Sequence, residues 1–149
     1  MLFKDLKENS KVWIYTSDRS LSDSESAYLQ SQSNEFVTNW AAHGVGLKAG
    51  SLVYKNRFLI IVADESQANA SGCSIDSSVK FVKAMGVELG TDFFNRMNLM
   101  VTKDEEELKP VHISELSNYL DEKFYNPMIT TLEQLREEWL IPVSASPFV

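Results

Sequence analysis

The chain has 149 residues, of which 44% are hydrophobic and 23% charged, and its 14 Lys and Arg against 21 Asp and Glu give a net charge of −7. This length favours one domain with a core that needs no disulfide or metal ion, so we expect residues 1–149 to form a single domain. The negative charge repels phosphate backbones and anionic lipids, which argues against nucleic acid or a membrane as a partner.

The first predicted elements are a strand at residues 12–16 and a helix that follows it. Ser22 and Glu25 have the Ser-x-x-Glu spacing of a capping box, which marks the start of the helix. The glycines at positions 44 and 46 supply its end. Apolar residues fall on one stripe of this helix, at Leu29, Phe36, Val37 and Trp40.

The middle of the chain predicts a hairpin and a second helix. Residues 51–54 and 57–63 have the composition of strands and flank a short turn at Lys55 and Asn56. The second of these strands is apolar on both faces, which is typical of a central strand. A helix begins near Gly72, carries apolar residues at helical spacing and ends at Gly86 or Gly90. Residues 93–101 then predict a fourth strand, with a helical turn at residues 92–95 as the alternative for its first part.

The order strand, helix, strand, strand, helix, strand predicts an α+β fold with a ferredoxin-like βαββαβ core at about residues 11–102. In that fold the sheet is antiparallel and both helices cover one face. We expect the remaining third, about residues 110–149, to be a helical C-terminal extension of the same domain. It would contain helices at residues 114–124 and 131–139 and a final extended tail.

The chain directions of this fold place several reactive side chains at one edge of the sheet. The end of the first helix carries His43, the end of the third strand Asp64 and Glu65, and the start of the second helix Cys73 and Asp76. Free N–H groups in the first turn of a helix stabilise a thiolate, so Cys73 is a candidate nucleophile. His43 would act as its base, and Asp64 or Asp76 would orient the imidazole.

A blander interpretation of each of these residues stays open. A lone cysteine is usually a small buried hydrophobe, and a histidine near the end of a helix is often a partner of the helix dipole or part of the core.

One cysteine and two histidines are too few for a structural zinc site, and no calcium-binding loop appears. The stretch 44–51 has Lys48 before its last glycine and is no P-loop. We therefore predict no cofactor and no metal.

The motif Gly-Cys-Ser-Ile-Asp at residues 72–76 resembles a family of short bacterial proteins without an established activity. The resemblance covers about residues 12–101 and includes the segments 12–15, 18–19 and 57–58, together with Phe36, Trp40 and His43-Gly44. Some members of that family carry the label of ABC-transporter ATPase, which the missing P-loop contradicts here. The resemblance implies no catalytic residue.

These observations favour a small binding or interaction module that recognises an unknown protein or a small anionic ligand. A homodimer is expected by analogy, because ferredoxin-like sheets often associate through an exposed face or edge. The alternative is a thiol-dependent enzyme or redox-sensitive protein that uses Cys73. Residues 1–11 carry five charges and do not resemble a secretory signal, so with its single cysteine we expect a cytoplasmic protein.

Overall fold

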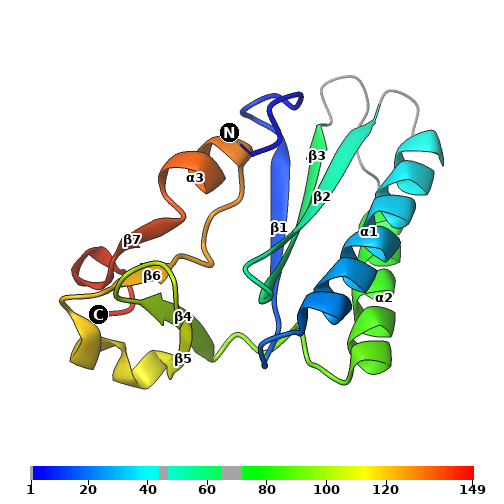
Figure 1. The fold of residues 1–149 in the computed structure, drawn as a ribbon. Coiled ribbons are helices and arrows are strands. Elements are labelled where there is room, and N and C mark those ends of the chain that lie inside the picture. The colour runs from blue at the N-terminus through cyan, green and yellow to red at the C-terminus, as the bar shows by residue number, and fades with distance from the viewer. Residues whose placement is uncertain (1, 44–46, 65–71) are drawn as a thin grey trace.

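The computed structural model describes residues 2–43, 47–64 and 72–149, with backbone only at 42–43 and 72–75. Two antiparallel sheets form two lobes that lie side by side (Figure 1). Two long helices cover one face of the first sheet, and the C-terminal lobe, residues 98–149, packs against its other face. The α+β class is therefore confirmed.

The first sheet has the strand order β1-β3-β2, with β1 at Lys11–Thr16, β2 at Lys48–Tyr54 and β3 at Phe58–Asp64. The hairpin between β2 and β3 turns at Lys55 and Asn56, which both have positive φ as predicted for a tight turn. All seven residues of β3 are buried. Leu59, Ile61 and Ala63 face the helices, whereas the alternate residues Phe58, Ile60 and Val62 face the C-terminal lobe. Burial on both faces explains why this strand is entirely apolar up to Asp64.

The two long helices are α1 at Asp23–His43 and α2 at Gly72–Leu89. The capping box of α1 is confirmed, because the Glu25 N–H donates to Ser22 Oγ and the Ser22 N–H donates to Glu25 Oε1. Arg19 joins the start of α1 to the end of α2: its guanidinium forms an ion pair with Glu25 and donates to the carbonyl of Leu89. No helix in the described ranges is both long enough and apolar enough to cross a membrane.

The expectation of a helical C-terminal extension is wrong. This lobe contains a second sheet with the order β5-β4-β6-β7. Its elements are β4 Asn98–Thr102, β5 Lys109–His112, the 3₁₀ helix η1 Ile113–Tyr119, β6 Lys123–Tyr125, α3 Leu132–Glu137, β7 Leu140–Pro142 and the 3₁₀ helix η2 Val143–Ala145. The predicted helix at 114–124 is thus one short 3₁₀ helix followed by a strand, whose Phe124 is needed in the core of this lobe. The predicted helix at 131–139 exists as α3 and is capped by Thr131.

The predicted fourth strand at residues 93–101 is also corrected. Only Asn98–Thr102 is a strand, and it pairs with β5 and β6 instead of β1. The Asp92 and Asn95 side chains accept hydrogen bonds from the backbone N–H groups of Phe94 and Met97, which forms two local turns. These turns interrupt the strand and direct β4 away from β1. The four-stranded ferredoxin-like sheet is therefore not confirmed.

Candidate functional site

The elements that carry the predicted catalytic residues end at one edge of the first sheet. The end of α1, the end of β3 and the start of α2 all lie toward the edge where β1 begins (Figure 1). The backbones of His43 and Cys73 belong to the last and first turns of these helices, and Glu65 lies outside the described residues. The side chains of His43 and Cys73 also lie outside them, so a shared thiol site stays a prediction.

The two aspartates of that hypothesis have different surroundings. Asp64 is buried and opposite Lys48 in the register of β2 and β3, whereas Asp76 is exposed on α2. Within the part of the chain that the structure describes, no group of three His, Cys, Asp or Glu side chains could hold a metal ion. Asp64 and Asp76 remain the predicted orienting residues.

A cleft lies on the other side of β1, between the outer edge of this strand and the C-terminal lobe. We call it the β1 cleft. Its volume is about 580 Å³, which is within the usual range for ligand sites. Strand β1 forms one wall, and the segments that precede β4 and α3 form the others. The lining residues are Asn9, residues 11–16, Phe58, Phe93, Asn95, Arg96, residues 98–100, Tyr125, Pro127 and residues 129–131.

The charges of the β1 cleft differ in sign from those of the protein as a whole. Lys11 and Arg96 line it, and none of the lining residues that the structure describes is Asp or Glu, although the chain has a net charge of −7. In the described ranges no hydrogen bond or ion pair joins Arg96 to another residue, and its side chain is exposed. Burial raises the pKa of Tyr15, and the hydrogen bond with Ser78 and the positive charge of Arg96 oppose this effect. Arg96 therefore provides an available cation beside the aromatic side of the cleft.

A second arginine lies at the end of the cleft. Arg57 is only 7% exposed, and its Nε donates to the carbonyl oxygen of Ser17 at 3.1 Å. It lines a small cavity that shares Thr16, Asn95, Asn98 and Met100 with the β1 cleft. Burial lowers the pKa of Arg57, and the nearby Asp18 opposes this effect.

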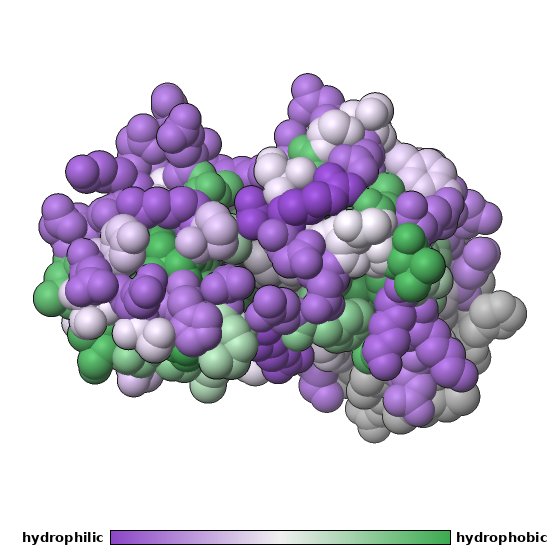
Figure 2. Space-filling model, turned by 90° about the horizontal axis from the view of Figure 1, so that it is seen from below, coloured by the Kyte–Doolittle hydropathy of each residue, from purple (hydrophilic) through white to green (hydrophobic). Residues whose placement is uncertain are grey.

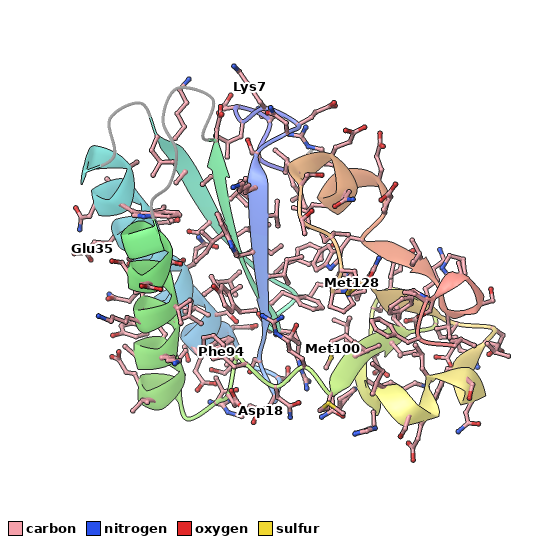
Figure 3. The ribbon with its side chains drawn as sticks, turned by 180° about the vertical axis from the view of Figure 1, so that it is seen from behind. Lys7, Asp18, Glu35, Phe94, Met100 and Met128 are labelled. Atoms are coloured by element: carbon pink, nitrogen blue, oxygen red, sulfur yellow. The ribbon has the colours of Figure 1, made fainter. Side chains whose placement is uncertain are left out.

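Asp18 lines the same small cavity, and its negative charge offsets part of the charge of Arg57. Its Oδ1 accepts a hydrogen bond from Thr91 Oγ1 at 2.6 Å and one from the backbone N–H of Asp92 at 3.2 Å. The bond from Thr91 is the main reason that the pKa of Asp18 is lowered. Figure 3 shows Asp18 at the lower end of β1 and Met100 beside the strand, toward the C-terminal lobe.

Another hollow, of about 670 Å³, lies against the second half of α2 and is lined by residues 90–94. Its charged lining residues in the described part of the chain are two carboxylates, Asp18 and Asp92, and one cation, Lys83, which lies over the Phe94 ring. Figure 2, which views the molecule from this end, shows a mainly hydrophilic surface with small hydrophobic patches. Among the described residues, this hollow has no open sheet edge, and its carboxylates outnumber its cation, so the β1 cleft is the better candidate for a site that binds an anion.

Sequence reasoning missed the β1 cleft because it assigned residues 93–101 to one strand. The signal was present in the polar run Asn95-Arg96 followed by Met97-Asn98, since three polar residues in four do not fit a strand in the core. Arg57 carried a second signal, as a cation directly before an entirely apolar strand. Neither signal indicates that the two segments meet, because this depends on where β4 pairs.

The comparisons with known proteins add no relative. No protein-family model, no curated protein and no solved structure matches this chain. The resemblance carried by residues 72–76 therefore stays a prediction, and the function has to be argued from the geometry of the described residues.

Proposed function

We propose that this protein is a binding module and that its ligand site is the β1 cleft. The ligand would carry a negative charge on an apolar or aromatic body. The observation that carries this proposal is the charge of the lining: its described residues include two cations and no carboxylate, in a protein with an excess of seven negative charges.

The other lining residues support the same class of ligand. Phe93, Met100 and Tyr125 offer apolar or aromatic surface. The asparagines at positions 95 and 98 offer amide groups that hydrogen-bond without adding charge. Ligand sites in proteins usually combine a mostly apolar wall with a few polar groups that fix orientation. An anion with an apolar body would satisfy Arg96 and cover the aromatic wall at the same time.

A calorimetric titration with two matched compounds tests this proposal. The first is 2-naphthoate and the second is 2-naphthamide, which has the same ring system without the charge. We expect the carboxylate to bind about tenfold more tightly, because a charge-assisted hydrogen bond to a guanidinium is stronger than a neutral one. Arg96→Gln should remove most of this preference and leave the affinity for the amide nearly unchanged.

Lys103→Gln is the matched control, because it removes one positive charge from an exposed side chain outside the cleft lining. It should keep the preference for the carboxylate. The proposal is wrong if neither compound binds, or if both variants lower the affinity for 2-naphthoate equally, since the effect would then reflect net charge alone.

A further inference from the structure

The outer edge of β1 is paired at both ends and open between them. The Val12 N–H donates to the carbonyl oxygen of Thr130 at 3.0 Å, and the Asp18 N–H donates to that of Asp92 at 3.1 Å. The Ser17 N–H donates to the carbonyl oxygen of Arg57 on the opposite side of the strand, toward β3. Backbone groups alternate in direction along a strand, so those of residues 12, 14, 16 and 18 face outward.

Between these two bonds, the N–H groups of Ile14 and Thr16 have no backbone partner among the described residues. Both residues line the β1 cleft. Six residue steps separate Val12 from Asp18, which is roughly 20 Å of strand at about 3.4 Å per residue. The open part of the edge is therefore long enough for a peptide of about five residues.

The chain already forms the first step of such a pairing. Thr131 forms an antiparallel bridge with Lys11, and the Leu132 N–H donates to the carbonyl oxygen of Ser10 at 2.9 Å. Among the described residues, no backbone hydrogen bond joins residues 126–129 to β1, and Pro127 lines the cleft. A second segment could continue this antiparallel ladder at Ile14 and Thr16.

The two faces of an added strand would meet different surroundings. Phe93 and Tyr15 belong to the core on the helix side, and the guanidinium of Arg96 interacts electrostatically with Tyr15. Met100, Tyr125 and Ile129 belong to the core on the side of the C-terminal lobe. Figure 3 shows Phe94 toward the helices and Met100 toward the C-terminal lobe, on opposite sides of β1. One face therefore favours acidic side chains and the other favours apolar ones.

We propose that the β1 cleft binds an extended peptide with alternating acidic and apolar residues, which adds to β1 as an antiparallel strand. This inference rests on the proposed function and specifies its ligand. Backbone groups of the peptide pair with Ile14 and Thr16, its carboxylates reach Arg96, and its apolar side chains contact the wall around Met100. The peptide comes from another protein. The β1 strand of a second copy lies inside that copy's own cleft and would have to enter the cleft of this chain to pair with β1.

The experiment measures binding of the peptide Glu-Val-Glu-Val-Glu-amide, which places its two valines opposite Ile14 and Thr16, by fluorescence anisotropy. A dye is attached through an added N-terminal linker. In an antiparallel pair, residues opposite Ile14 and Thr16 point their side chains to the same face as Ile14, which faces the C-terminal lobe. The valines therefore direct their N–H groups to β1 and the glutamates direct theirs away. N-methylation of either valine should weaken binding about five- to tenfold, and N-methylation of the central glutamate should change it less than twofold.

Both changes are made in the peptide, so the protein remains folded in every arm. Replacement of the glutamates by glutamine should also weaken binding about tenfold, and hydrogen exchange at the Ile14 and Thr16 amides should slow when the peptide is bound. Equal effects of the two N-methylations, unchanged exchange at these amides, or dimerisation through β1 in light scattering would overturn the strand proposal. Binding of 2-naphthoate in the same protein would show that the proposed function survives, and its loss would show that both fail.

Discussion

The burial of β3 on both faces predicts that the two lobes unfold together. Ile60 and Leu59 are adjacent, both fully buried, and point to opposite sides of the first sheet: Ile60 to the C-terminal lobe and Leu59 to the helices. Truncation of a fully buried Ile or Leu to Ala costs about 2–5 kcal/mol, because it removes buried area and leaves a cavity. We expect Ile60→Ala and Leu59→Ala to lower the free energy of unfolding by similar amounts within this range.

The tryptophans report separately on the two sides. Trp13 and Trp40 pack against each other on the helix side, whereas Trp139 packs against Phe58 and Tyr125 on the other. Urea unfolding is followed by fluorescence in proteins with and without Trp139→Phe. Each should show one transition, and Ile60→Ala and Leu59→Ala should each shift that whole transition. Ile60→Ala would refute this reasoning if it shifted only the signal of Trp139, since the lobes would then unfold independently.

Three further predictions concern other parts of the fold. The hydrogen bond from Arg19 lowers the pKa of Glu25 to about 2 from its ordinary 4.5, so this contribution to stability is present above about pH 4.5 and is lost as the pH falls toward 2. Glu25→Gln should flatten the pH dependence of the urea midpoint in this range, and an unchanged profile would contradict the assignment. A Cβ at Gly86 would lie 2.7 Å from the carbonyl oxygen of Thr91, so Gly86→Ala should cost about 1–3 kcal/mol, and a gain in thermal stability would contradict this expectation. If Cys73 is a nucleophile, iodoacetamide should alkylate it rapidly with an apparent pKa well below about 8.5, and slow alkylation would argue for a buried structural cysteine.

The sequence predicts the first lobe well because its signals are local. The capping box at Ser22 and Glu25, the positive φ at Lys55 and Asn56, and the apolar run of β3 each depend on residues close together in the chain. Burial of β3 on both faces also follows from its composition. The periodicity does not reveal what covers the second face.

The C-terminal lobe is harder to predict because its strands are short. Strand β6 has only three residues, and its pairing with β4 and β7 is decided by contacts distant in sequence. Its Phe124 fits the apolar stripe of a helix as well as the buried side of a strand. The β1 cleft depends on this lobe, since its wall around Met100 exists only where β4 pairs away from β1. A site formed by tertiary pairing leaves little local signal.

The most direct test is a crystal structure of the protein with the acidic–apolar peptide. The account predicts an extended backbone hydrogen-bonded to Ile14 and Thr16, with a carboxylate of the peptide within hydrogen-bond distance of Arg96. A peptide bound on another surface, with the edge of β1 still open, would contradict it.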